Sequence, residues 1–179
     1  MKVIILAAGI GSRLGNLTKF KPKCMVKILE NPLLFYQLKT LKSLNINNIY
    51  VVTGYRQNDL NFEGINYIFN SSYATTNMVA SLFCAREVLE MGEDVLISYG
   101  DIIYNTEILK KTINANYQIN IPIDIEWKKY WKLRMENPLD DAETLKLDSE
   151  FNILEIGKKT KDYRDTVSYT HLRAHETAY

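Results

Sequence analysis

The chain has 179 residues, of which 46% are hydrophobic and 24% charged, and its formal net charge is +1. These values are typical of one soluble globular domain, and the near-zero charge gives no bulk attraction to nucleic acid or to a membrane surface. The two cysteines, Cys24 and Cys84, favour free thiols in the cytoplasm over a disulfide-stapled secreted domain. No apolar run is long enough to span a bilayer.

Strand and helix patterns alternate along the chain. The β-branched run Lys2–Leu6 predicts a strand buried on both faces, and a loop of small and basic residues follows over 7–23. Asn31 and Pro32 predict the N-cap and the first residue of an amphipathic helix, and Thr106 predicts a second N-cap. The remaining predicted elements are strands over 49–53, 65–69, 94–98 and 119–125, helices over 77–89, 106–113 and 127–135, and a hairpin of 144–147 with 151–156.

This alternation predicts an α/β fold with right-handed βαβ units. We expect a Rossmann-like, mostly parallel sheet with helices on both faces, in one domain over residues 1–165 that is cut short at its C-terminal end. Residues 166–179 are expected to be a non-native tail, because Val167–Tyr179 continues no helix or strand period and resembles translated sequencing-adapter DNA. An ordinary disordered tail is the alternative.

The loop after the first strand has a composition that suits phosphate binding. It begins with four small residues, Ala7, Ala8, Gly9 and Gly11. Such residues let the backbone approach a ligand closely and expose N–H groups as an anion nest. Arg13 can grip phosphate oxygens in a forked geometry, and Pro22 stiffens the segment that presents Lys23. The spacing excludes a Walker A loop, and Leu14 stands where the dinucleotide fingerprint needs a third glycine. For the glycines alone, a tight turn is the alternative.

Asp101 follows the strand predicted over 94–98, in the sequence Ser98-Tyr99-Gly100-Asp101. Parallel sheets bind ligands at the carboxyl ends of their strands, and Mg²⁺ commonly takes one or two carboxylates. Asp101 is therefore the candidate Mg²⁺ ligand, with a simple turn aspartate as the alternative.

The segment LAAGIGSRLGNLTKFKPK resembles the N-terminal signature of the nucleotidyltransferase superfamily that includes the sugar-1-phosphate nucleotidyltransferases. The resemblance implies a Mg²⁺-dependent enzyme that joins an NTP to a phosphorylated small molecule, with Arg13 and Lys23 as catalytic residues. It implies these nucleotide-binding residues: Leu6, Ala7, Ala8, Gly9, Gly11, Ser12, Arg13, Lys23, Gly54, Tyr55, Thr76, Asn77 and Ser81. A second metal carboxylate is expected beyond residue 165, so the activity of this chain is left open.

Three further segments, over 70–78, 99–104 and 136–145, resemble the phosphocholine and 2-aminoethylphosphonate cytidylyltransferase branch. This resemblance implies transfer of CMP from CTP to such an acceptor, without a nucleic acid or membrane partner. Tyr104, Trp127, Trp131, Asp140 and Asp141 are the candidate acceptor contacts, since aromatic faces bind quaternary ammonium and carboxylates bind amines. The alternative for the two tryptophans is that they form one packed helix face. The alternative for the two aspartates is that they are solvated turn residues.

For the whole chain, three alternatives stay open. The first is a sugar-1-phosphate nucleotidyltransferase that uses UTP or dTTP. The second is a non-catalytic nucleotide-sensing domain, against which the presence of Arg13, Lys23 and Asp101 argues. The third and weakest is a dehydrogenase, which the missing third glycine disfavours.

Overall fold

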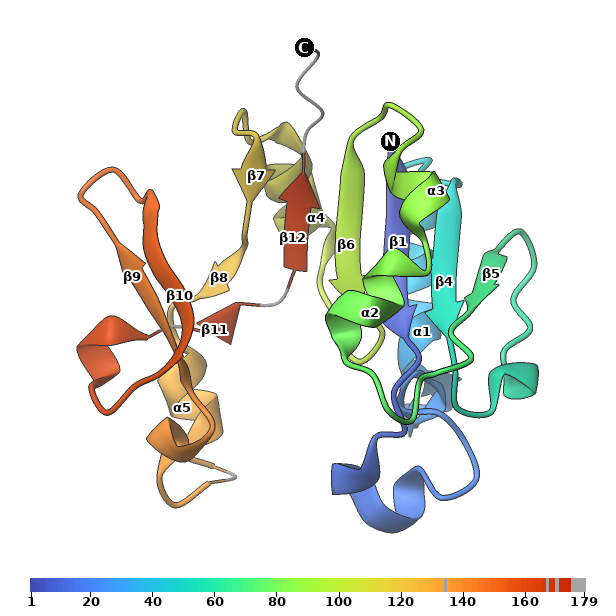
Figure 1. The fold of residues 1–179 in the computed structure, drawn as a ribbon, viewed down its shortest axis with the longest axis horizontal. Helices are drawn as coiled ribbons and strands as arrows, with labels where there is room; N and C mark the ends of the chain where they lie inside the picture. Colours follow the sequence, from blue (N-terminus) through green and yellow to red (C-terminus); the bar gives the residue numbers. More distant parts are fainter. Residues whose placement is uncertain (134, 167, 170, 175–179) are drawn as a thin grey trace. The chain divides into compact units, whose positions relative to one another are not determined.

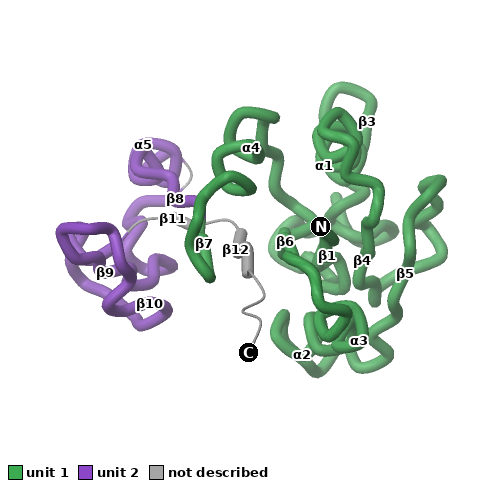
Figure 2. Tube along the Cα trace, turned by 90° about the horizontal axis from the view of Figure 1, so that it is seen from above, with its two compact units in different colours: residues 1–121, 171–179 green, residues 122–170 purple. Residues whose placement is uncertain are grey.

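The computed structural model describes residues 1–133, 135–166, 168–169 and 171–174 (Figure 1). It divides into two compact units, Met1–Ile121 with His171–Tyr179, and Pro122–Thr170 (Figure 2). Part of the tail predicted to be non-native lies outside the described residues, and its origin stays a prediction, as does the domain boundary at residue 165. Among the described residues, no helix is both long and apolar enough to cross a membrane.

Unit 1 is built on a six-stranded sheet with the order β5-β4-β1-β6-β12-β7. Four neighbouring strands run parallel to one another: β1 (Lys2–Ala7), β4 (Ile49–Thr53), β5 (Asn66–Phe69) and β6 (Val95–Tyr99). The strand β12 (His171–Ala174) pairs antiparallel with β6 and with β7 (Ile119–Asn120). The predicted mostly parallel sheet is confirmed.

Helices cover both faces of this sheet, as the view of Figure 2 shows. They are α1 (Leu33–Ser43) and α4 (Thr106–Asn114) on one face, and α2 (Met78–Phe83) and α3 (Arg86–Leu89) on the other. Alternate residues of β1 supply the two cores: Val3 and Ile5 pack with Leu34 and Leu41, while Ile4 packs on the opposite side. Because these strand residues are fully buried on both faces, β1 occupies the centre of the unit.

The helix start predicted at Asn31 and Pro32 is wrong. These residues form β3 (Asn31–Pro32), which pairs antiparallel with β2 (Lys27–Ile28). The turn between the two strands consists of Leu29 and Glu30, whose φ angles of 46° and 71° lie in the left-handed region. Because Asn31 and Pro32 belong to this hairpin, α1 begins only at Leu33.

Two other predicted helix boundaries are wrong. The helix predicted over 77–89 is the pair α2 and α3, and Asn77 caps the first of them by accepting the Ala80 N–H at 3.1 Å. The N-cap of α4 is Asn105 rather than Thr106, because the Asn105 Oδ1 accepts the Ile108 N–H at 2.8 Å.

The described residues of unit 2 form one short α-helix and four strands: β8 (Ile123–Asp124), α5 (Trp127–Trp131), β9 (Glu143–Leu147), β10 (Ile153–Lys159) and β11 (Ser168–Tyr169). The predicted hairpin is confirmed as the antiparallel pair β9 and β10. The strand predicted over 119–125 breaks at Pro122, which has no N–H to donate to a sheet. The helix predicted over 127–135 ends at Trp131.

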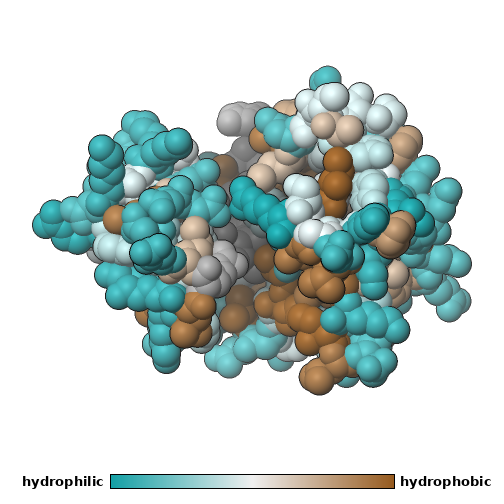
Figure 3. Space-filling view, turned by 90° about the horizontal axis from the view of Figure 1, so that it is seen from below, coloured by the Kyte–Doolittle hydropathy of each residue, from teal (hydrophilic) through white to brown (hydrophobic). Residues whose placement is uncertain are grey.

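Short 3-10 segments join several of these elements, and the first of them is kinked at Gly15. They span Ser12–Leu17, Lys23–Met25, Gln57–Asp59, Pro138–Asp140 and Tyr163–Asp165. In the view of Figure 3 the surface of unit 1 mixes hydrophilic, intermediate and hydrophobic residues, and its most hydrophobic residues gather mainly in one area.

Candidate functional site

A cavity of about 270 Å³ lies in unit 1 at the carboxyl ends of β1 and β6. Parallel sheets bind ligands at this edge, and the volume is near the lower end of small-molecule sites, about 300 Å³. Two loops border the cavity, the β1 loop (residues 8–23) and the β6 loop (residues 100–105). The lining residues are Leu6, Ala7, Ala8, Gly9, Gly11, Lys23, Cys24, Tyr73, Thr76, Asn77, Met78, Ser81, Tyr99, Gly100 and Asp101.

Most of the predicted site residues meet in this cavity, although they come from separate stretches of the chain. Those that line it are Leu6, Ala7, Ala8, Gly9, Gly11, Lys23, Thr76, Asn77, Ser81 and Asp101. Ser12 and Arg13 are exposed on the 3-10 turn that follows Gly11. The sequence did not single out five lining residues, Cys24, Tyr73, Met78, Tyr99 and Gly100, which all stand beside or within the motifs that carry the family resemblance.

The β1 loop turns its glycine backbone toward the cavity. A Cβ placed at Gly9 would meet no atom of the described chain within 4 Å, so this stretch of backbone is open to a ligand. Gly11 has a φ of 70°, and a Cβ there would lie 3.0 Å from the Cβ of Lys23. The Thr18 hydroxyl fixes the turn by donating to the Gly11 carbonyl oxygen at 2.9 Å.

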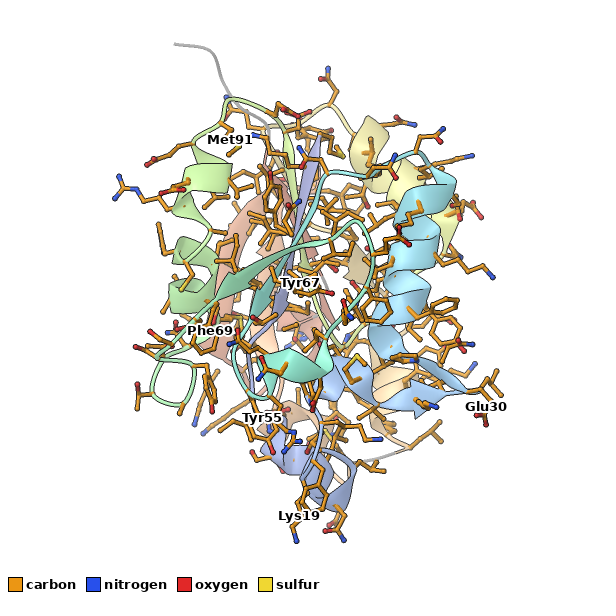
Figure 4. The ribbon with its side chains drawn as sticks, turned by 90° about the vertical axis from the view of Figure 1, so that its right-hand side faces the viewer. Lys19, Glu30, Tyr55, Tyr67, Phe69 and Met91 are labelled. Carbon is orange, nitrogen blue, oxygen red and sulfur yellow. The ribbon has the colours of Figure 1, made fainter. Side chains whose placement is uncertain are left out.

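Gly54 and Tyr55 are not among the residues that line the cavity. They lie next to the β1 loop and support it. The Tyr55 N–H donates to the Ala8 carbonyl oxygen at 3.0 Å, and its hydroxyl donates to the Lys19 carbonyl oxygen at 2.6 Å. A Cβ at Gly54 would lie 2.4 Å from the Cβ of Tyr73, so only glycine fits there. The Lys19 side chain points away from the body of the protein (Figure 4).

Lys23 and Asp101 meet in the cavity. The Lys23 Nζ donates to the Asp101 Oδ2 in an ion pair whose side chains are 40% and 33% exposed. Partly exposed pairs of this kind contribute only about 0–1 kcal/mol to stability. Both charged groups can therefore exchange partners at modest cost when a charged ligand enters.

Helix α1 supports the β6 loop from the core. Gln37 is fully buried, and its Nε2 donates to the carbonyl oxygens of Tyr99 at 2.8 Å and Ile102 at 2.7 Å. Its Oε1 accepts the Ser98 hydroxyl at 3.1 Å. One side-chain amide thus binds the backbone on both sides of Asp101.

Asn70 fixes the part of the cavity wall that comes from the first turns of α2 and the residues just before it. Its Nδ2 donates to the Thr76 hydroxyl oxygen at 3.1 Å and to the Ser81 hydroxyl oxygen at 3.0 Å, and its Oδ1 accepts the Ser72 N–H at 2.9 Å. Since Asn70 is 4% exposed, these bonds satisfy a buried amide. They also fix two hydroxyl groups that line the cavity.

Cys24 presents a neutral thiol at the cavity. The residue is 2% exposed, and burial raises the pKa of its thiol to about 12. The group therefore stays protonated at neutral pH, and a protonated thiol is a poor nucleophile and a poor metal ligand. The Cys24 thiol therefore brings no negative charge into the cavity, and the acidic side chain that lines it is that of Asp101.

The candidate acceptor contacts lie in both units. Tyr104 belongs to the core of unit 1, where it is 6% exposed and burial raises its pKa to about 12. In unit 2, Trp127 is 4% exposed and packs edge-on against Trp131, with ring centroids 5.1 Å apart. Tyr163 packs 6.1 Å from Trp127, and the Lys128 Nζ lies 3.6 Å from the Tyr163 ring centroid. The two tryptophans thus form the packed helix face that the sequence left as an alternative.

Asp140 and Asp141 are exposed at the end of a 3-10 turn in unit 2, and the Asn137 Nδ2 donates to the Asp140 Oδ1 at 2.7 Å. Their contact with an acceptor stays a prediction. Among the described residues, no group of three or more His, Cys, Asp or Glu side chains is placed to hold a metal ion. Asp101 is the carboxylate that the cavity itself provides.

Comparison with known proteins shows the family to which the chain belongs. Residues 3–124 match the family described as the MobA-like NTP transferase domain. The chain is 45% identical over 172 residues to a CTP:phosphoglutamine cytidylyltransferase of Campylobacter jejuni, a match that covers 91% of this chain and 68% of that protein. It is 39% identical over 93 residues to a choline-phosphate cytidylyltransferase of Streptococcus pneumoniae, covering 50% of this chain and 41% of the relative.

A 2-aminoethylphosphonate cytidylyltransferase of Lancefieldella rimae is 28% identical over 109 residues, which cover 58% of this chain and 46% of that protein. The fold matches the solved CTP:phosphocholine cytidylyltransferase of Streptococcus pneumoniae with a TM-score of 0.63 and 22% identity, over 97% of this chain and 67% of that one. These matches confirm the resemblance carried by the β1 loop. The chain belongs to the MobA-like NTP transferase family, and its relatives there include cytidylyltransferases.

Proposed function

We propose that the cavity binds CTP and that the protein transfers CMP to a phosphate- or phosphonate-bearing acceptor, releasing pyrophosphate. The observation that carries this proposal is the meeting of three features in one cavity: the open backbone at Gly9, the ammonium of Lys23 and the carboxylate of Asp101. The cytidylyltransferases among the relatives support CTP as the donor.

In the proposed reaction, an anionic oxygen of the acceptor attacks the α-phosphorus of CTP. A new P–O bond forms while the bond to the bridging oxygen breaks, and pyrophosphate leaves with the electron pair. No general base is needed because the attacking oxygen is already ionised, so positioning and charge neutralisation are the main requirements. Lys23 and Arg13 would supply positive charge to the phosphates, and the N–H groups of the β1 loop would bind phosphate oxygens.

The residues of the cavity fit Mg²⁺ as a cofactor. Mg²⁺ prefers hard oxygen ligands and is often held by one or two carboxylates together with substrate phosphates. Asp101, partly exposed in the cavity, would be the protein ligand. Bound there, Mg²⁺ would neutralise phosphate charge, and the Lys23 ammonium would then turn from Asp101 to the nucleotide.

The acceptor is proposed from the relatives and from the charges of unit 2. Phosphocholine, phosphoglutamine and 2-aminoethylphosphonate all combine an anionic phosphorus group with a cationic nitrogen. The exposed carboxylates of Asp140 and Asp141 would suit that nitrogen. The ring of Tyr163 is less suited, because the Lys128 ammonium already lies over its face.

Pyrophosphate release, measured over a grid of nucleotides and acceptors, tests the proposal. The nucleotides are CTP, UTP and dTTP, and the acceptors are phosphocholine, 2-aminoethylphosphonate, phosphoglutamine and glucose 1-phosphate. We expect release with CTP and at least one cationic acceptor. Turnover with glucose 1-phosphate alone would indicate the sugar-1-phosphate alternative, and CTP binding without turnover would indicate a nucleotide-sensing domain.

A further inference from the structure

We propose that Gln37 is a positioning residue, which sets the direction of the Asp101 carboxylate through the backbone of the β6 loop. Its expected effect on the Mg²⁺ dependence of the reaction rests on the proposed function, whereas its expected effect on hydrogen exchange in the β6 loop does not. Gln37 does not itself line the cavity, so it would act through the residues that flank Asp101, among them the lining residue Tyr99.

Gln37 is a polar residue in an apolar position. Its neighbours on the buried face of α1 are Leu34, Leu38 and Leu41, which all pack in the core. An apolar side chain would fill this place in the helix equally well, whereas an amide must find hydrogen-bond partners when it is buried. Both amide hydrogens and the amide oxygen of Gln37 do find partners, and all of these lie at the end of β6 or just after it.

The partners of Gln37 bracket the aspartate. The carbonyl of Tyr99 precedes Asp101 by two residues and the carbonyl of Ile102 follows it by one, so the amide binds both ends of the short stretch that contains Asp101. The opposite side of this stretch is tied to β1, since the Gly100 N–H donates to the Leu6 carbonyl oxygen at 2.8 Å. A backbone fixed on both sides sets the direction of the Asp101 Cα–Cβ bond before any ligand arrives, which limits where the carboxylate can lie.

Helix α1 extends this support along the rest of the β6 loop. The Thr40 hydroxyl, one turn after Gln37, donates to the Tyr104 carbonyl oxygen at 3.3 Å. Thr40 also donates to the Tyr36 carbonyl oxygen within its own helix, so its bond to the loop is the weaker of two. Among the described residues, the Gln37 amide has no hydrogen-bond partner within its own helix, and its three bonds go to Ser98, Tyr99 and Ile102.

Gln37→Met tests the proposal, because methionine has a similar shape and removes every hydrogen bond of the amide. Leu41→Ala is the matched control, since it weakens the core packing of the same helix and removes no side-chain hydrogen bond to the β6 loop. Hydrogen exchange reports the loop directly, as the ratio of the Gly100 amide rate to the rates of the β4 amides. We expect this ratio to rise about tenfold in Gln37→Met and to stay constant in Leu41→Ala.

The second readout is the Mg²⁺ concentration that gives half-maximal pyrophosphate release with CTP. We expect it to rise about tenfold in Gln37→Met, as is typical when a residue behind a metal ligand is removed, and to stay unchanged in Leu41→Ala. An unchanged exchange ratio would overturn the proposal whatever the activity. A raised ratio with unchanged Mg²⁺ dependence would overturn the link to Asp101, and absence of turnover in the unmodified protein would count against the proposed function only.

If Gln37→Met does not fold, Ser98→Ala is the second variant. It removes the bond to the Gln37 Oε1 and leaves both bonds to the loop carbonyls possible, so the amide loses its orientation but not its donors. We expect a rise of about threefold in the same exchange ratio. A ratio equal to that of the unmodified protein would contradict the proposal.

Discussion

The β1 loop and the β6 loop leave neighbouring strands of one sheet, but they are supported in different ways. The β1 loop exposes most of its side chains, and its backbone is held at carbonyl oxygens that include those of Ala8, Gly11 and Lys19. The β6 loop is bound to the core through Gln37 and Thr40 of α1. A loop that surrounds a triphosphate needs free N–H groups, whereas a loop that presents one carboxylate needs a fixed direction.

The first prediction concerns the place where the β1 loop enters the core. Burial raises the pKa of the Cys24 thiol from 9.0 to about 12, which lowers its thiolate fraction near pH 8 by about 10³. Iodoacetamide at pH 8 should therefore label exposed Cys84 in the folded protein and leave Cys24 unlabelled, as peptide mass spectrometry can show. Labelling in urea should reach both cysteines. Equal labelling in the folded state would mean that the loop is not anchored in the core at this point.

The second prediction separates two lysines of the β1 loop. Lys23→Ala removes the ammonium that lies in the cavity, so we expect kcat to fall by roughly 10²–10³-fold while the thermal unfolding temperature is retained. Lys19→Ala is the matched control, because its side chain is exposed and points away from the cavity (Figure 4). Near-normal turnover of Lys23→Ala would refute the role of Lys23 in the reaction.

The third prediction compares one glycine from each loop. A Cβ at Gly100 would lie 2.9 Å from the Ala7 Cβ, so Gly100→Ala should lower the free energy of unfolding by about 1–3 kcal/mol. A Cβ at Gly9 would meet only a bound ligand, so Gly9→Ala should keep the stability and raise the KM for CTP about tenfold or more. Chemical denaturation and steady-state kinetics on both variants measure the two effects. If the two variants behaved alike, the difference in support between the loops would be disproved.

The smallest effect is expected outside both loops, in the turn between β2 and β3. Glu30 has a φ of 71°, which strains any residue with a Cβ, and Glu30→Gly should raise the free energy of unfolding by about 1 kcal/mol without changing kcat. Glu63→Gly, at an exposed glutamate outside the left-handed region, should give a small loss instead. A gain in kcat for Glu30→Gly would contradict the prediction, because it would show that the conformation of this turn affects the reaction.

The central strands were predictable from the sequence because burial on both faces leaves uninterrupted apolar runs. The helix boundary at Asn31 was not, since Asn31 and Pro32 pair with an earlier segment as a hairpin. The boundary at Thr106 was not, since it depends on which of two adjacent polar side chains accepts the Ile108 N–H. The cavity was largely predictable, because Lys23 and Asp101 belong to recognisable motifs. Gln37 was not, because one polar residue on an apolar helix face does not reveal which carbonyl groups it will meet.

The position of β1 at the centre of the sheet has a consequence for how the protein folds. β1 is made before its partners β4 and β6, which follow only after long stretches of chain, as the pairing of Leu6 with Val52 and Tyr99 shows. Contacts between such distant segments slow folding, because the intervening chain must be ordered before they form. On the ribosome, the first strand must therefore wait, with its apolar faces exposed, until most of unit 1 has emerged. Chaperones that bind short apolar segments would find this strand accessible during that interval.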